Sequence, residues 1–395
     1  MSVREYGRFL NPVIADVPPS GIRRFFDLAS TMKDTISLGV GEPDFRTPYP
    51  IRNAAINSLI DGETQYTPNR GLLSLRREIG IYLQGRYGIE YDPEREILVT
   101  VGASEAIDLA LRAMVRPGDE VLVPEPSYVS YAPSVIFAGG TPVPVITKQE
   151  DDFRLKPEHL RAAVTGKTKL LILPYPNNPT GGIMERTDLE QLAPIIEEHD
   201  MMVISDEIYS ELVYDGKSHV SFASIPGMYD RTMTINGFSK AFAMTGWRVG
   251  YVCGAGEIIN VLNKIHQYGI MCASRMGQVA AEEALRRGRE NGYEDVIAMR
   301  ESYDRRRRLM VESFQSMGLD CFEPYGAFYV FPSIRKTGLS SEEFCARLLK
   351  EKKVAAVPGN AFGACGEGNI RCCYATAIDK LNVALDRIAA FVQTA

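Results

Sequence analysis

Three polar side chains follow three apolar runs that are typical of buried strands. Asp206 follows MMVIS, Asn178 follows KLLILPY, and Lys240 follows TMTIN. In a parallel α/β sheet, ligands bind beyond the carboxyl ends of the strands, so polar residues at these positions are the first to consider for chemistry. The sequence therefore predicts a site at which a carboxylate, an amide and an amine meet.

Lys240 is the candidate nucleophile. A lysine that forms a Schiff base needs partial desolvation or a nearby cation, so that its amine is free near neutral pH. Most lysines are solvated surface residues. The segment NGFSKAFAMTGWRVG, however, follows a strand, is rich in small residues, and carries Arg248 eight positions after Lys240. This setting favours a buried, reactive amine.

Asp206 and Arg371 are candidate binding groups, each with a structural alternative. A carboxylate that pairs with a protonated pyridine nitrogen keeps the ring electron-poor, as a carbanion-stabilising cofactor requires. Capping of the following helix would explain Asp206 equally well. Tyr209 and Asn178 could donate to a ring oxygen. Arg371, in the strand-like run IRCCYATA, could grip a carboxylate with two hydrogen bonds or form an internal salt bridge.

The elements that would position these residues alternate between strand and helix patterns from residue 97 to residue 254. Such alternation predicts a mostly parallel sheet covered by helices. Seven short apolar runs are the expected strands: ILVTV from Ile97, EVLVP from Glu120, PVPVI from Pro142, KLLIL from Lys169, MMVIS from Met201, TMTIN from Thr232 and RVGYVCG from Arg248. After the first run, Gly102, Ala103 and Ser104 form a tight turn into a helix, which is a candidate anion site.

Length and composition indicate two domains. A chain of 395 residues exceeds one ordinary core. The βα rhythm predicts a large ligand-binding domain over residues 46–290, and residues 1–45 and 291–395 are expected to form a smaller α+β domain with an N-terminal arm. Hydrophobic residues make up 45% and charged residues 24%, with a net charge of −6. The acidic balance argues against nucleic acid and favours small-molecule partners. The start, MSVREYGRFLNPVIADVPP, has no apolar segment of signal-peptide length, and the longest apolar runs cannot span a bilayer, so we expect a cytoplasmic protein that does not bind membranes.

The remaining reactive residues suggest no further chemistry. Seven scattered cysteines without a CxxC pair imply neither a disulfide framework nor a zinc site, and the four histidines lack metal-ligand spacing. We therefore expect no metal. The run from Arg305 to Arg308 is flanked by Glu301, Asp304 and Glu312, which predicts a solvated helix face.

Nine motifs in order resemble the class I aminotransferases of fold type I, over essentially the whole chain. They are SLGVGEPDF from Ser37, YTPNRGLLSLR from Tyr66, VGASEAI from Val101, PSY from Pro126, YPNNPTG from Tyr175, SDEIY from Ser205, NGFSKAFAMTGWRVGY from Asn236, GAFYVFP from Gly326 and IRCCYA from Ile370. The resemblance implies an α/β fold with a large domain that binds pyridoxal phosphate and a smaller domain. It is nearest to a prokaryotic subgroup of aspartate, aromatic and N-acetyl-diaminopimelate aminotransferases.

The resemblance also implies roles for matching residues. Lys240 would be the Schiff-base lysine and proton shuttle, Asp206 would pair with the pyridine nitrogen, and Tyr209 and Asn178 would contact the ring oxygen. Tyr128 would stack on the ring. The phosphate would be held by Ala103, Ser104, Ser239 and Arg248, and by Tyr66 from a second subunit, which implies a homodimer with shared sites. The substrate carboxylate would be held by Arg371, Asn178 and the backbone at Gly41.

Two positions depart from the family pattern. Gly237 replaces a serine that contacts the phosphate in some relatives. Ser104 stands where some aspartate-preferring relatives carry a lysine for the distal carboxylate, so a strict preference for aspartate does not follow. The expected substrates are an L-amino acid, such as aspartate or an aromatic one, and a 2-oxo acid, with 2-oxoglutarate and glutamate as the usual pair. Candidate pocket residues are Ile22, Arg23, Tyr66 and Tyr131.

Other functions compete with ping-pong transamination. A carbon-sulfur β-lyase shares the cofactor and cannot be separated by motifs. A binding or sensor protein built on an inactive domain usually lacks the lysine or carries an added segment, whereas this chain has Lys240, Asp206 and Arg371. A serine hydrolase and a nucleotide-binding dehydrogenase are excluded, because GFSKA lacks the second glycine of GxSxG and no GxGxxG follows a strand.

Overall fold

A seven-stranded sheet forms the centre of the computed structural model, which describes residues 7–19, 32 and 34–394. Its strands lie in the order β2-β8-β7-β6-β5-β3-β4, and only β8 runs antiparallel to its neighbours. The strands are β2 (Ile97–Thr100), β3 (Glu120–Glu125), β4 (Thr141–Ile146), β5 (Thr168–Leu173), β6 (Met202–Asp206), β7 (Thr232–Gly237) and β8 (Gly250–Cys253). Each predicted run is one of these strands, so the predicted α/β sheet is confirmed.

Helices cover both faces of the sheet, because alternate residues of its strands are buried on opposite sides. In β2, Leu98 packs into the cluster that includes residues of α5 and α9, whereas Ile97 and Val99 pack with α4 and α10. The helices of this part are α3 (Tyr49–Ile60), α4 (Leu73–Tyr87), α5 (Gly102–Met114), α6 (Tyr131–Phe137), α7 (Pro157–Ala163), α8 (Arg186–Glu198), α9 (Gly256–Gly269) and α10 (Arg275–Asn291).

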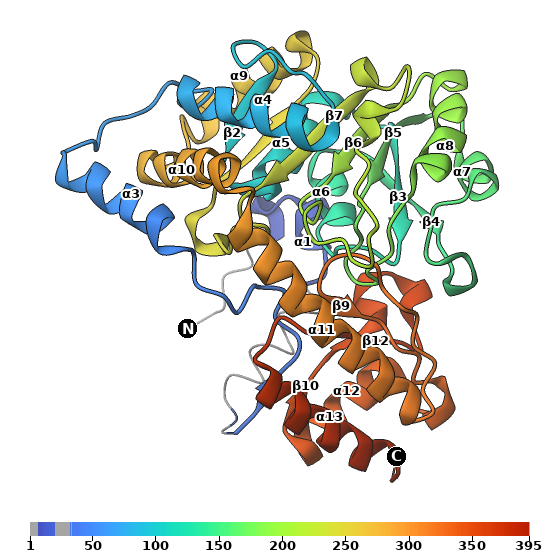
Figure 1. Ribbon diagram of the computed structural model, residues 1–395. Helices are drawn as coiled ribbons and strands as arrows, with labels where there is room; N and C mark the ends of the chain where they lie inside the picture. Colours follow the sequence, from blue (N-terminus) through green and yellow to red (C-terminus); the bar gives the residue numbers. More distant parts are fainter. Residues whose placement is uncertain (1–6, 20–31, 33, 395) are drawn as a thin grey trace, which may run out of the picture.

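A smaller unit lies beside the carboxyl edge of the large sheet (Figure 1). It combines β1 (Ile36–Ser37), β9 (Tyr329–Val330), β10 (Val354–Ala355), β11 (Val357–Pro358) and β12 (Ile370–Cys373) with the helices α11 (Glu294–Ser316), α12 (Ser341–Lys352) and α13 (Ile378–Val392). Strand β1 pairs with β10, so residues 36–37 join the C-terminal part of the chain, whereas the N-terminal residues 12–15 contact α6 of the large unit. A short helix, α1 (Pro12–Ala15), precedes it. The domain limits at residues 46 and 290 stay predictions.

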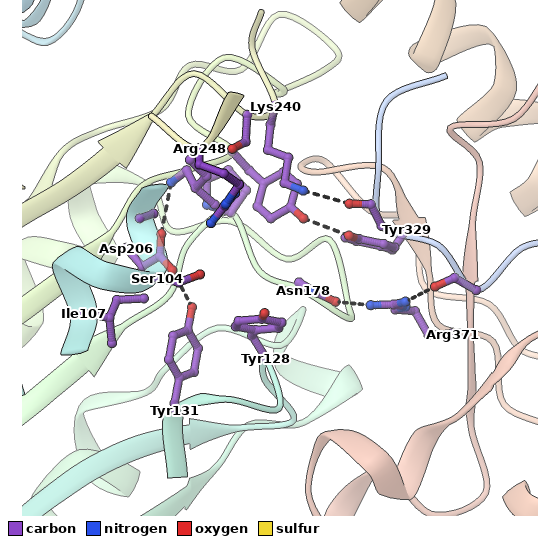
Figure 2. Close-up of a pocket in the computed structure, with 17 residues that line it drawn as sticks. Ser104, Ile107, Tyr128, Tyr131, Asn178, Asp206, Lys240, Arg248, Tyr329 and Arg371 are labelled. Carbon is purple, nitrogen blue, oxygen red and sulfur yellow. Dashed lines mark hydrogen bonds between the residues drawn. The ribbon is translucent and has the colours of Figure 1, made fainter. Parts of the chain in front are cut away.

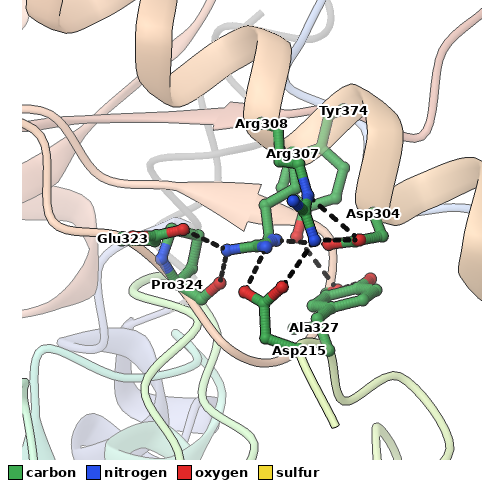
Figure 3. A network of polar contacts seen from close by, with 9 residues as sticks. Asp215, Asp304, Arg307, Arg308, Glu323, Pro324, Ala327 and Tyr374 are labelled. Carbon is green, nitrogen blue, oxygen red and sulfur yellow. Dashed lines mark hydrogen bonds and ion pairs between the residues drawn. The ribbon is translucent and has the colours of Figure 1, made fainter.

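The predicted solvated helix face is confirmed for Arg305 and Arg308 of the four-arginine run, which are exposed, but not for Arg306 and Arg307. Arg307 has no exposed side-chain surface and donates to Asp304, Asp215, Glu323 and the carbonyl oxygen of Pro324 (Figure 3). Arg306 is also buried. The prediction is wrong for these two residues, because loops that carry Asp44, Asp215 and Glu323 cover this side of α11, and the local sequence of the helix does not specify them.

Within the residues that the structure describes, no helix is both long and apolar enough to cross a membrane. The same residues contain no cluster of three histidine, cysteine or acidic side chains that could hold a metal ion.

Candidate active site

A cavity of about 340 Å³ lies where the carboxyl ends of the parallel strands meet the smaller unit. Residues that line it are Gly39, Gly41, Ala103, Ser104, Ile107, Tyr128, Tyr131, Pro176, Asn178, Asp206, Ile208, Tyr209, Ser239, Lys240, Arg248, Tyr329 and Arg371. Figure 2 shows their side chains around the cavity. Every residue that was predicted to bind the cofactor or the substrate carboxylate is among them except Tyr66.

Lys240 reaches the cavity from the turn that follows β7. Its Nζ donates to the carbonyl oxygen of Gly41 at 2.7 Å. The side chain as a whole keeps some exposure, but its amine is desolvated, and this burial lowers the pKa of Lys240 to about 8. An amine with this pKa is partly neutral near physiological pH, which a nucleophile requires.

Asp206 is the last residue of β6 and is buried. Its carboxylate accepts a hydrogen bond from the Tyr131 hydroxyl at 2.7 Å and one from the backbone N–H of Ile208 at 3.2 Å. Burial raises the pKa of Asp206, and these two hydrogen bonds oppose the rise. Tyr131 therefore lines the cavity as predicted, but its hydroxyl is committed to Asp206.

The turn from β2 into α5 forms a cradle for an anion. Gly102 has a φ of +77°, and a Cβ there would lie 2.5 Å from the Arg248 guanidinium, so only glycine fits. Ala103 and Ser104 follow at the N-terminus of α5, where backbone N–H groups lack helical partners. Arg248 thus stands beside a helix N-terminus, and both attract negative charge.

Arg371 enters from β12 on the opposite side of the cavity. It donates to Asn178 Oδ1 at 2.8 Å and to the carbonyl oxygen of Gly39, and its Nε has no partner in the structure. Its hydrogen-bond partners among the described residues are an amide oxygen and a carbonyl oxygen and include no carboxylate, so the alternative of an internal salt bridge is not what forms. Gly41, whose backbone was predicted to join this group, instead accepts from Lys240.

The loop that carries Asn178 is held by its own side chains. Asn177 Oδ1 accepts from the backbone N–H of Thr180 at 3.2 Å and from its hydroxyl at 2.9 Å. Gly181 has a φ of +72°, and a side chain there would meet the backbone of Gly326. Glycine therefore lets the smaller unit pack directly on this loop.

The glycine at position 237, which departs from the family pattern, has a steric reason. A Cβ on Gly237 would lie 2.9 Å from the Cα of Gly250 and 3.0 Å from the carbonyl oxygen of Val249. Strands β7 and β8 approach too closely here for a serine. The anion cradle consequently consists of Arg248, Ser239 and the α5 N-terminus.

Several site residues were not identified from the sequence, and two predicted ones cannot be placed. Tyr329, Gly39, Ile107, Pro176 and Ile208 line the cavity without having been singled out. Tyr329 and Gly39 lie inside the quoted motifs GAFYVFP and SLGVGEPDF, which were the available signal. The candidate pocket residues Ile22 and Arg23 lie outside the described residues.

The donor set fits pyridoxal phosphate. This molecule presents a pyridine nitrogen, a phosphate and an aldehyde, and the cavity offers a buried carboxylate, an anion cradle and a desolvated amine. Tyr128 adds an aromatic face. No group of pyridoxal phosphate requires Arg371, so this arginine is available to bind the carboxylate of a second molecule, such as a substrate.

Comparison with known proteins identifies the family. The model of the class I and II aminotransferases matches residues 33–388. The aspartate aminotransferase of Pyrococcus abyssi is 50% identical, over 94% of this chain and 95% of its own, and the aromatic-amino-acid aminotransferase 2 of Thermococcus litoralis is 46% identical over the same shares. A solved structure titled Pyrococcus protein-A1 has a TM-score of 0.94 at 48% identity, over 97% of this chain and 98% of its own. The chain belongs to the class I and II aminotransferase family and is a pyridoxal-phosphate-dependent enzyme that transfers an amino group between an amino acid and a 2-oxo acid.

Proposed function

We propose that the cavity around Lys240 is the site of transamination and that its residues divide into a cofactor side and a substrate side. Lys240, Asp206, Tyr209, Asn178, Tyr128, Ala103, Ser104, Ser239 and Arg248 are assigned to the cofactor, and Arg371, with Asn178 and the backbone at Gly41, is assigned to the substrate carboxylate. The observation that carries this assignment is the desolvated Lys240 amine inside a cavity that also contains Asp206 and Arg371.

Pyridoxal phosphate supplies an electron-poor ring that accepts the electron pair left when the α-proton departs. In the proposed assignment Asp206 keeps the ring nitrogen protonated, since a buried carboxylate stabilises a neighbouring positive charge. Arg371 fixes the substrate carboxylate, and this orients the α-hydrogen toward Lys240. The free Lys240 Nζ removes that proton, a step typically worth about 10²- to 10⁴-fold in rate.

We further propose a homodimer with shared sites. Tyr66 is 78% exposed and does not line the cavity of its own chain. Helix α3, which lies near it in sequence, exposes Tyr49, Leu59 and Ile60, and Ile60 is 75% exposed. An exposed apolar helix face of this kind is typical of an interface between subunits. In the dimer, Tyr66 would reach the phosphate in the partner's cavity.

A hybrid-dimer experiment tests the shared site. Lys240→Ala and Tyr66→Glu chains are each expected to be inactive alone, the first because it lacks the amine and the second because an added carboxylate repels the phosphate. When the two are co-expressed, one site of each hybrid dimer combines Lys240 of one chain with Tyr66 of the other, so activity should return. No recovery in hybrids of confirmed composition would contradict the sharing of Tyr66.

An absorbance spectrum tests the cofactor and substrate assignment. The purified protein with pyridoxal phosphate should show a visible-region band that is lost on adding glutamate and restored by 2-oxoglutarate. The Lys240→Ala variant should lack this cycle. The same measurement with aspartate and with aromatic amino acids shows which of them is the second amino-acid substrate. A protein that stays colourless after pyridoxal phosphate is added and the excess is removed would refute the proposed site.

The cytoplasmic location of the protein stays a prediction.

A further inference from the structure

Tyr329 is a buried residue of the cavity wall that the assignments above leave without a role. It lies in β9 of the smaller unit, is 1% exposed, and lines the same cavity as Lys240. The large sheet supplies the cofactor side of the cavity, so Tyr329 faces that side from across the boundary between the two units (Figure 2).

Two contacts connect Tyr329 with both sides of the site. Its hydroxyl lies 2.8 Å from the hydroxyl of Tyr209, a residue assigned to the cofactor ring oxygen. Its ring lies under the guanidinium of Arg371, which is 4.5 Å from the ring centroid. A cation at this distance is attracted by the face of an aromatic ring.

The position of the Tyr329 side chain is fixed by its surroundings. Its backbone pairs with Cys373 in β12, two residues after Arg371, and its ring packs at 4.9 Å from that of Phe328. At Gly41, a Cβ would overlap the Tyr329 hydroxyl. Glycine at position 41 therefore leaves the space that the phenol occupies, and the ring has little freedom to turn away.

Burial raises the pKa of both Tyr209 and Tyr329, so both are neutral phenols at physiological pH. Of two neutral hydroxyls at hydrogen-bond distance, one donates and the other accepts. If Tyr209 donates to the cofactor ring oxygen, Tyr329 must be the donor to Tyr209. A phenol that accepts such a bond is a stronger donor in its turn.

We propose that Tyr329 is a positioning residue with two separable functions: its hydroxyl strengthens the hydrogen bond that Tyr209 donates to the cofactor, and its ring holds Arg371 in place for the substrate carboxylate. The proposal rests on the proposed function, since it assumes that Tyr209 faces the cofactor and Arg371 the substrate.

The Tyr329→Phe variant tests the hydroxyl alone. The ring remains, so the KM for glutamate should stay unchanged. The ring oxygen of the cofactor would lose part of its hydrogen bond and hold a proton more tightly. The pH midpoint of the visible absorption band should therefore rise by about 0.1 to 0.5 unit, since one hydrogen bond strengthens the next in a chain by about 10 to 30%.

The Tyr329→Leu variant removes the ring as well. Arg371 would lose its cation–π contact, and the KM for glutamate should rise by about 3- to 30-fold in addition to the shift of the midpoint. If the Leu variant does not fold, Tyr329→Met, which keeps more of the side-chain volume but has no aromatic ring, tests the ring function through the KM, and the Phe variant tests the hydroxyl function.

Tyr374→Phe is the matched control. Tyr374 is also fully buried, and its hydroxyl donates to the carbonyl oxygen of Ala327 at 3.2 Å without lining the cavity. This variant should change neither the pH midpoint nor the KM. A midpoint in Tyr329→Phe equal to that of the wild type, or an equal shift in Tyr374→Phe, would overturn the proposal. Wild-type protein without any visible band would instead refute the proposed function.

Discussion

The cavity around Lys240 and the cluster around Arg307 are both rich in charge, but they differ in how far their hydrogen-bonding groups are satisfied. Arg307 donates to three carboxylates and to the carbonyl oxygen of Pro324. In the cavity, Lys240 has a hydrogen bond only to the carbonyl oxygen of Gly41 among the described residues, and Arg371 Nε has no partner. Figures 2 and 3 show this contrast.

The difference separates a binding site from a structural ion pair. A buried polar group without a partner costs free energy, and a group that faces a cavity can regain the lost hydrogen bond from a ligand. A cluster whose members are mutually satisfied needs no ligand and holds together the elements that contribute to it. Arg307 joins α11 to the loop of Asp215 that follows β6, whereas Lys240 and Arg371 keep capacity for a substrate and a cofactor.

The largest expected effect is on the rate of transamination, and substitution of Lys240 should cause it. Lys240→Ala should lower the transamination rate by about 10²- to 10⁴-fold, because it removes the group that moves the α-proton. The rate is measured with glutamate and a keto acid at saturating pyridoxal phosphate. Lys264→Ala, which changes an exposed lysine on α9, is the control and should be fully active. Substantial activity in the Lys240→Ala variant would contradict the assignment.

The next effect is on stability, at Arg307. Arg307→Met should lower the free energy of unfolding by about 2 to 3 kcal/mol, near the lower end for a broken buried ion pair, since its partners retain some exposure to water. Urea denaturation measures the change. Arg305→Met alters an exposed neighbour and should have an effect within about 0.5 kcal/mol. Equal effects of the two substitutions would mean that the cluster contributes nothing.

A comparable loss, in substrate binding, is expected at Arg371. Arg371→Leu should lower kcat/KM by about 10- to 150-fold, which corresponds to the loss of charged hydrogen bonds to the carboxylate. Arg371→Lys keeps the charge but not the two parallel hydrogen bonds, so it should recover only part of the activity. If Arg371 were purely structural, both variants would lose stability and retain the KM of the wild type.

The mildest consequence concerns the cofactor-free protein and its dependence on pH. The pKa of Lys240 is lowered to about 8, so the folded protein is destabilised by the charged amine below that pH. This destabilisation fades as the pH rises from about 8 to the ordinary lysine value of about 10.4. Cofactor-free Lys240→Met should be more stable than the wild type at pH 7, by about 1 to 3 kcal/mol.

The control for this prediction is the same measurement at pH 10. There, the difference in the free energy of unfolding between Lys240→Met and the wild type should be much smaller. A difference that is constant between pH 7 and pH 10 would show that the gain comes from packing of the methionine and not from the buried charge.

The positions of the residues that follow the strands could be predicted, because the short apolar runs in the sequence show where each strand ends. The apolar runs from Ile97 to Cys253 define the sheet, and parallel strands bring Asn178, Asp206 and Lys240 to one edge whatever the details of packing. The family motifs supplied the remaining predicted residues, which the cavity brings together with the exception of the exposed Tyr66.

The fold class, the strands and the place of the candidate lysine follow from the sequence alone, since they depend on hydrophobic periodicity and on residue types next to strand ends. The contacts between distant segments, in contrast, are fixed by tertiary packing. Tyr209 and Tyr329 are 120 residues apart, and Lys240 lies 199 residues from Gly41. The burial of Arg306 and Arg307 likewise depends on which loops cover α11. Such contacts arise when the two units pack against each other, which no local pattern encodes.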